Sequence, residues 1–115
     1  METILQRLLA VDGVTGVLLV GKDGLVVAST MEGDEEELLG AMAAAAYDAA
    51  GRYIEQLGMG DVRHALFETP GGTVQVTDGG DLLIVVRCSF HASIGRIRME
   101  AGQASLQLAE RIGSY

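Results

Sequence analysis

Apolar positions along this chain recur with two periods, and these periods predict eight secondary-structure elements. Helical spacing of the apolar residues predicts amphipathic helices over three ranges, 3–10, 34–57 and 93–112. Short β-rich runs bounded by turn residues predict strands over five ranges, 14–20, 25–29, 62–68, 74–77 and 82–88. The order is therefore αββαβββα, without an internal repeat or a dividing linker, and we expect a single domain over residues 1–115.

Two local patterns indicate how these elements assemble. The Asp-Gly pair in the 21–24 turn is a strong signal for a β-hairpin between the first two strands. The apolar run 82–88 is typical of a strand in the middle of a sheet that is covered on both faces. We therefore predict an α+β fold with a five-stranded antiparallel sheet. The first and third helices are expected on one face, the long second helix on the other, and strand 62–68 at an edge.

The long helix 34–57 has several distinct surfaces. Asp34 and Glu37 have the spacing of a capping box at its start. A broad apolar arc is expected to face the core, and it consists of Leu38, Leu39, Met42, Ala46, Ala49, Ala50, Tyr53, Ile54 and Leu57. The expected solvent face lies roughly opposite and carries Glu37, Asp48, Arg52 and Glu55.

A strip of mostly small residues runs between these two surfaces and consists of Gly40, Ala44, Tyr47 and Gly51. Each glycine inside a helix costs about 1 kcal/mol relative to alanine, so two of them on one side suggest a compensating close contact. A contact between the helices of two copies is one explanation. The alternative is that the small residues face solvent or a bulky neighbour.

The third helix, 93–112, carries two apolar stripes. One is expected to face the core and consists of Ile94, Ile97, Ala101, Ala104, Leu108 and Ile112. The other lies beside it and consists of Gly95, Met99, Gly102 and Leu106. We expect the short first helix to pack on this second stripe.

Composition narrows the classes of function. The 115 residues are 49% hydrophobic and 21% charged, as in a globular protein, and no apolar run approaches the length of a membrane span. The net charge of −8 argues against nucleic acid and anionic membranes as partners. A single cysteine excludes an internal disulfide, and the first residues lack the basic segment of a signal peptide. These features predict a cytoplasmic protein without membrane insertion.

The order of elements and two segments resemble a known family. The segment GVTGVLLVGKDGLVVAS at 13–29 and the segment SIGRIRME at 93–100 flank a long alanine-rich helix and three strands. Together they resemble the roadblock / dynein light chain seven family over nearly the whole chain. The resemblance implies a profilin-like αββαβββα domain, and the two segments are signatures of the fold that carry no chemistry themselves.

The resemblance also implies how the domain associates with itself. Family members form homodimers or heterodimers by joining their sheets through the third strand and by pairing their second helices. Carried onto this sequence, the predicted dimer interface consists of Gly40, Ala44, Tyr47, Gly51, Val62, His64, Leu66 and Glu68.

A Ras-like small GTPase is the partner that the resemblance implies. Bacterial members of the MglB type regulate a GTPase of the MglA type, which docks on the paired second helices. The corresponding partner-binding residues here are Glu37, Ala41, Asp48, Arg52 and Glu55. Two other functions stay open. One is a signalling adaptor paired with a sensor kinase or another roadblock chain, and the other is a small-ligand sensor, which a pocket with convergent polar groups would favour.

Several chemical motifs are incomplete in this sequence. Cys88 and His91 have the spacing of half a zinc site, but a structural site needs four ligands, so we predict no metal. The Gly21-Lys22 pair lacks the longer glycine loop, the Ser or Thr and the helix of a P-loop. No Ser, His and acid are spaced as a recognisable triad, so we predict no catalytic residue, no cofactor and no enzyme activity.

Arg52 has two possible roles. A GTPase regulator can supply an arginine in trans that stabilises charge in the transition state. The simpler expectation is an ion pair with Asp48, one helical turn earlier, and this is the role that we predict.

Overall fold

The computed structural model describes residues 2–31, 35–89 and 92–113, with side chains described up to residue 109. Its helices are α1 (Glu2–Leu9), α2 (Glu36–Gln56) and α3 (Ile94–Gly113). Its strands are β1 (Val14–Gly21), β2 (Val26–Ser29), β3 (His64–Thr69), β4 (Gly72–Asp78) and β5 (Leu82–Cys88). The predicted αββαβββα order is confirmed. Asp34, the predicted helix cap, lies outside the described residues.

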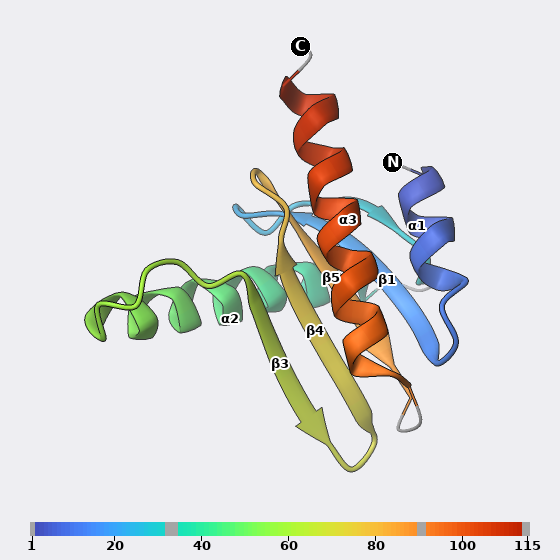
Figure 1. The fold of residues 1–115 in the computed structure, drawn as a ribbon, viewed down its shortest axis with the longest axis horizontal. Coiled ribbons are helices and arrows are strands. Elements are labelled where there is room, and N and C mark those ends of the chain that lie inside the picture. Colours follow the sequence, from blue (N-terminus) through green and yellow to red (C-terminus); the bar gives the residue numbers. More distant parts are fainter. Residues whose placement is uncertain (1, 32–34, 90–91, 114–115) are drawn as a thin grey trace.

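The five strands form one antiparallel sheet in the order β2-β1-β5-β4-β3. The apolar strand β5 lies in the middle and β3 lies at one edge, as predicted. Helices α1 and α3 cover one face of the sheet, and α2 crosses the other face (Figure 1). The profilin-like α+β architecture expected from the sequence is therefore the observed one.

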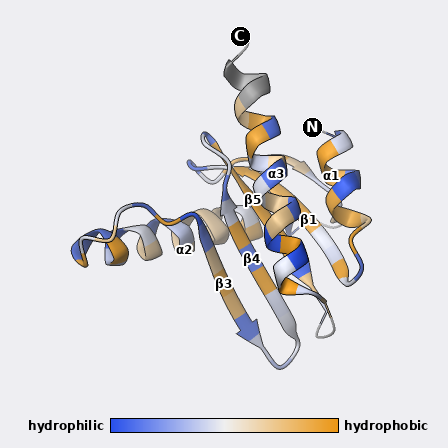
Figure 2. Cartoon of the chain, in the orientation of Figure 1, coloured by the Kyte–Doolittle hydropathy of each residue, from blue (hydrophilic) through white to orange (hydrophobic). Residues whose placement is uncertain are grey.

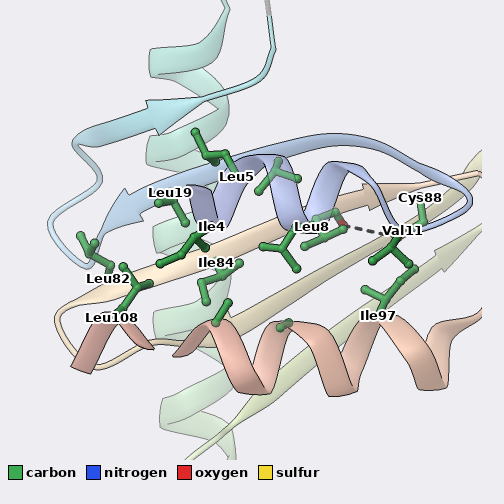
Figure 3. Close-up of a cluster of buried hydrophobic side chains, with 14 residues drawn as sticks. Ile4, Leu5, Leu8, Val11, Leu19, Leu82, Ile84, Cys88, Ile97 and Leu108 are labelled. Atoms are coloured by element: carbon green, nitrogen blue, oxygen red, sulfur yellow. Dashed lines mark hydrogen bonds between the residues drawn. The ribbon is translucent and has the colours of Figure 1, made fainter. Parts of the chain in front are cut away.

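The larger of two core clusters lies between the sheet and the α1/α3 layer. Leu8 of α1 and Ile97 of α3 meet the inward side chains of β1 and β5, such as Leu19 and Ile84, and all four are almost fully buried (Figure 3). Cys88 is also buried in this cluster, at the end of β5, as expected. Fully burying a large aliphatic side chain stabilises a fold by about 1.5–3 kcal/mol, so this layer supplies much of the folding energy.

The prediction that α1 packs on the second stripe of α3 is wrong. Arg7 of α1 pairs with Glu100 at 3.0 Å and also contacts Gln103, both on a different flank of α3. Met99 and Leu106, in the predicted stripe, are 56% and 67% exposed. The longer polar side chains hold α1 beside α3, and the small-residue stripe is left on the outer side.

The β1–β2 hairpin follows the expected turn chemistry. Asp23 accepts a hydrogen bond from the Leu25 N–H through Oδ1, and Gly24 has φ +92°. Left-handed φ values favour glycine, so the Asp-Gly pair specifies this turn.

Among the described helices, none is both long and apolar enough to span a membrane.

Candidate protein-interaction surface

Helix α2 contacts the sheet through its smallest residues. Gly40 and Ala44 are its buried positions. A Cβ placed on Gly40 would lie 2.6 Å from Val26 Cγ2 and 3.3 Å from the Gly24 carbonyl oxygen. Because these distances leave no room for a side chain, the helix lies directly on the β1–β2 hairpin.

The prediction that the large apolar arc of α2 faces the core is therefore wrong. Most of its large members are exposed, with Leu38 at 61%, Met42 at 58% and Tyr53 at 65%, while Ile54 is half-buried. A helix whose small side rests on a sheet turns its large side chains away from that sheet. We name five of these exposed residues the apolar face of α2: Leu38, Leu39, Met42, Tyr53 and Leu57.

The second half of α2 extends beyond the sheet. The helix starts behind β1 and β2, crosses the sheet, and continues past the edge strand β3 (Figure 1). Its projecting half carries both hydrophobic and hydrophilic positions (Figure 2). Three apolar residues in it, Tyr53, Leu57 and the following Met59, are 52–71% exposed. Such a contiguous exposed apolar surface is typical of a protein–protein contact.

An apolar groove lies beside the first half of α2, where the helix leaves part of the sheet uncovered. Its volume is about 370 Å³, and its floor includes Phe67 of β3 and Val74 of β4. The full lining is Leu18, Met31, Leu39, Met42, Ala43, Ala46, Phe67, Val74, Val76, Val85 and Arg87. A small-ligand site uses several convergent polar groups, whereas this lining provides Arg87 alone. The groove is therefore better suited to apolar side chains of another protein.

A polar cluster holds α2 at the far side from this groove. The Tyr47 hydroxyl lies 2.9 Å from the Val62 carbonyl oxygen and 2.9 Å from Asp78 Oδ2, and these two acceptors share its one proton. Lys22 Nζ lies 3.0 Å from Asp78 Oδ1 and 5.7 Å from the centre of the Tyr47 ring. Burial and the adjacent Asp78 carboxylate raise the pKa of Tyr47, so the phenol stays protonated and remains a donor. We name Tyr47, Asp78 and Lys22 the Tyr47 cluster.

The edge strand β3 pairs with β4 on one side only. His64, on the α3 side of β3, has Nδ1 2.9 Å from Thr77 Oγ1 and 3.3 Å from Gln75 Nε2. Burial, followed by the charges of Arg98 and Arg63, lowers the pKa of His64. A neutral imidazole whose Nδ1 accepts a hydrogen bond from Thr77 or Gln75 fits this environment. The backbone of β3 along its outer side is available to pair with another strand.

Comparison with known proteins decides the family. The model of the Roadblock/LC7 domain matches residues 1–87. The chain belongs to the Roadblock/LC7 domain family. Two uncharacterised proteins of Methanocaldococcus jannaschii are each 36% identical to this roadblock chain over 106 residues, covering 91% of it and 93% of each relative.

Solved structures agree on the fold. Myxococcus xanthus MglB superposes with a TM-score of 0.91 at 22% identity, covering 98% of this chain and 94% of MglB. Acanthamoeba castellanii profilin IB superposes with a TM-score of 0.69 at 14% identity, covering 92% of this chain and 93% of the profilin. At these identities the likeness establishes the profilin-like architecture. Together with the family match it supports a single small roadblock-type domain.

The predicted partner-binding residues lie on a flank of α2 next to its sheet-facing side. All five are exposed to solvent, which binding to another protein requires: Glu37, Ala41, Asp48, Arg52 and Glu55. Arg52 Nε lies 3.0 Å from Asp48 Oδ2, so the predicted ion pair is present. Both side chains are more than half exposed, so this ion pair stabilises the fold by only about a few tenths of a kcal/mol.

The predicted dimer residues lie in two different places. In the strip on α2, Gly40, Ala44 and Tyr47 contact the sheet or its ends within the same chain, while Gly51 has nothing within 4 Å of an added Cβ. The close backbone approach that the glycines indicated is thus made by the β1–β2 hairpin at Gly40. Val62, His64, Leu66 and Glu68 lie on or just before the edge strand. The interface itself stays a prediction.

Sequence reasoning missed the groove as a binding surface. Met31, Phe67, Val74 and Arg87 come from separate elements and meet only in the fold. One signal was present: Arg87 interrupts the otherwise apolar run of β5 on the face that it shares with Leu83 and Val85.

The metal motif falls partly outside the described residues. His91 is not described, and Cys88 is buried with its thiol 3.8 Å from the Val86 carbonyl oxygen. Burial raises the pKa of the Cys88 thiol, which keeps it in the neutral form. Over residues 2–31, 35–89 and 92–109, no group of three or more His, Cys, Asp or Glu side chains could hold a metal ion.

Acid should weaken the Tyr47 cluster of this roadblock chain. Burial alone raises the pKa of Asp78, but hydrogen bonds from the Gly80 N–H, Lys22 and Tyr47 outweigh burial and lower it. A carboxylate with a lowered pKa stabilises the fold at every pH above its unfolded-state pKa of about 4. This contribution to stability is lost as the pH falls through the lower, folded-state pKa. We expect Asp78→Asn to reduce the free energy of unfolding by about 1–2 kcal/mol at neutral pH.

Urea unfolding followed at neutral pH and at decreasing acid pH checks this expectation. The stability difference between wild type and Asp78→Asn should shrink below about pH 4, because the wild-type carboxyl is then protonated as well. Asp81→Asn, at an exposed neighbouring position, is the control and should change stability little. A pH-independent difference would contradict the assigned role of the Asp78 charge.

Proposed function

We propose that this roadblock chain acts as a homodimer that binds a Ras-like small GTPase of the MglA type and modulates its nucleotide cycle. The observation that carries the proposal is the apolar face of α2, which is exposed in a single chain although its residues are large and hydrophobic. The class of partner is the one that the resemblance to the roadblock family implies. The acidic composition and lone buried cysteine are compatible with a cytoplasmic location for this activity.

The shape of one chain supports the proposed dimer. Pairing β3 with β3 of a second copy about a two-fold axis would continue the sheet across both chains. The projecting half of α2 would then extend over the sheet of the partner, on the side where the partner has its apolar groove. Tyr53 and Leu57 would enter this groove beside Leu39 and Met42 of the partner subunit. Each chain would thereby bury the apolar side chains that the other leaves exposed.

The paired helices would present a composite surface to the GTPase. Glu37, Asp48 and Glu55 give this surface an acidic border, which favours a basic region on the partner. Binding changes the nucleotide cycle only if the GDP and GTP states of the GTPase bind with different affinity, because equal affinity shifts no equilibrium. Since Arg52 is paired with Asp48, we propose that regulation acts on the residues of the GTPase itself.

The decisive experiment uses the GTPase that copurifies with the tagged protein from its source cells. Affinity is measured for the GDP-loaded and GTP-analogue-loaded forms, together with the rate of GTP hydrolysis. The double variant Glu37→Lys, Asp48→Lys should weaken binding by about tenfold or more through like-charge repulsion and should leave the dimer intact. Glu2→Lys, an exposed position on α1, is the matched control with unchanged affinity.

Three outcomes distinguish the alternatives. Unequal affinity for the two nucleotide states supports regulation, whereas equal affinity without a change in hydrolysis supports an adaptor. Recovery of a sensor kinase or another roadblock chain in place of a GTPase also supports the adaptor.

Arg52→Ala should change stimulated hydrolysis by less than about twofold, because an arginine supplied in trans would contribute at least a thousandfold.

A further inference from the structure

We propose that Arg87 of each chain binds the C-terminal end of α2 of its partner subunit, and so fixes the register of the helix pair. This inference rests on the homodimer proposed above. It identifies a polar contact that would fix one register of the two α2 helices, which apolar contacts alone would not define.

The end of α2 is an uncompensated negative site. Its first turn carries Glu36 and Glu37, which suit the positive end of the helix dipole, but its last turn carries no basic residue. Glu55 adds a negative charge near the same end. The carbonyl groups of Ile54 and Glu55 accept hydrogen bonds from Met59 and Gly58. Those of Gln56 and Leu57 accept none among the described residues, so they remain open to a donor.

Arg87 is a cation without a carboxylate partner. Its side chain makes no ion pair in the part of the chain that is described. Its Nε donates to Thr15 Oγ1 at 3.1 Å and its Nη2 donates to the Thr15 carbonyl oxygen at 3.3 Å. A guanidinium has five N–H donors, so Thr15 orients the group while leaving donors free for a second acceptor.

The geometry brings these two sites together. Arg87 pairs with Val74, which pairs with Phe67, so the three residues form one row from β5 to the edge strand. All three line the apolar groove. The α2 helix of the same chain crosses nearer the other end of the strands, where Tyr47 contacts Asp78. In a two-fold dimer, α2 of the partner therefore runs antiparallel over the row that ends at Arg87.

The lengths also match. Gly51 lines the same hollow as Val62, the residue shortly before β3, so α2 passes the sheet edge near Gly51. From there to Leu57 the helix advances about 9 Å at about 1.5 Å per residue. Strand β5 lies about 12 Å from a two-fold axis at the β3 edge, for strands about 4.8 Å apart. The long side chain of Arg87 spans the remaining few ångströms to the helix end.

The first test measures the dissociation constant of the dimer by sedimentation equilibrium. Arg87→Met keeps the length of the side chain but removes its charge and donors. The dissociation constant should rise about twenty-five-fold at low ionic strength, because each of two symmetric contacts contributes about a fivefold change. Arg96→Met, at an exposed position of α3 outside the groove, is the matched control and should change the constant less than about twofold.

The second test places a positive charge on the helix end with Gln56→Lys. In the wild-type background this lysine faces Arg87 of the partner, so the dissociation constant should rise at least fivefold by repulsion. In the Arg87→Met background the same lysine meets no cation and should change the constant less than twofold. A purely structural role for Arg87 would not produce this difference between backgrounds.

The outcomes separate the two proposals. A wild-type protein that stays monomeric at all concentrations overturns the dimer and this contact with it. A dimeric wild type whose Arg87→Met and Arg96→Met variants have equal dissociation constants overturns the contact alone. Equal effects of Gln56→Lys in the wild-type and Arg87→Met backgrounds also overturn it.

Discussion

We expect the Met42→Glu variant to sediment as a single chain at concentrations at which the wild-type protein is a dimer. Met42 is 58% exposed in one chain and lines the apolar groove, so the substitution places a carboxylate where the partner helix would lie. Burying an unpaired charge costs several kcal/mol, and the two-fold axis repeats the cost. The dissociation constant should rise by more than about a thousandfold.

Ala41→Glu is the matched control for this prediction. It introduces the same charge one residue earlier, at a position that is exposed in the single chain and outside the apolar groove. Thermal unfolding should show that both variants keep their fold, because neither position is buried in the single chain. Multi-angle light scattering should find Ala41→Glu dimeric and Met42→Glu monomeric. A dimeric Met42→Glu protein would place the interface elsewhere.

The second large effect is expected at Gly40. Gly40→Val should lower the free energy of unfolding by about 2–3 kcal/mol, because overpacking a close contact forces neighbouring atoms apart. The added Cβ alone would lie 2.6 Å from Val26 Cγ2, and Val26 belongs to the hairpin on which α2 rests. Urea-induced unfolding of the variant and the wild type measures the difference.

Gly51 provides a control within the same helix. An added Cβ at Gly51 has nothing within 4 Å, so Gly51→Ala should raise stability by about 0.5–1 kcal/mol through helix propensity. The two glycines are therefore expected to respond with opposite sign to a larger side chain. A stabilising Gly40→Val substitution would show that the helix is not held against the hairpin as described.

Periodicity and turn chemistry were sufficient to predict the architecture. The apolar run of β5 indicated a central strand, and the Asp23-Gly24 pair indicated the hairpin, because both signals depend on local sequence. The edge position of β3 followed from the order of the elements. These features require no knowledge of how side chains pack across the fold.

The orientation of α2 could not be obtained in the same way. Hydrophobic periodicity identifies the most apolar side of a helix, and for an isolated domain that side is normally the buried one. Here the buried side is defined by size, with Gly40 and Ala44 against the sheet, while Met42 and Tyr53 are exposed. A sequence pattern does not say whether its apolar side chains are buried by the same chain or by another. The glycines were the available clue, and they indicated a close contact without naming the partner element.

The interaction surface was only partly predictable for a related reason. The predicted partner-binding residues of α2, including Asp48 and Arg52, belong to one helix and are recognisable from family resemblance. The groove is assembled from β3, β4, β5 and the segment after β2, so Phe67 and Arg87 become neighbours only after folding. Whether Phe67 and Arg87 lie on the same face of the sheet depends on the strand register. A shift of one residue in the pairing would move one of them to the opposite face.

The two margins of the sheet are unequal, and this inequality has a consequence for the proposed edge-to-edge pairing. The margin formed by β3 has six residues and an overhanging helix, whereas the margin formed by β2 has four residues and lies where α2 begins. Stacking chain upon chain into a filament would require both margins to accept a neighbour in the same manner. If only the β3 margin accepts a neighbour, as in the proposed dimer, edge-to-edge growth ends once two chains have met.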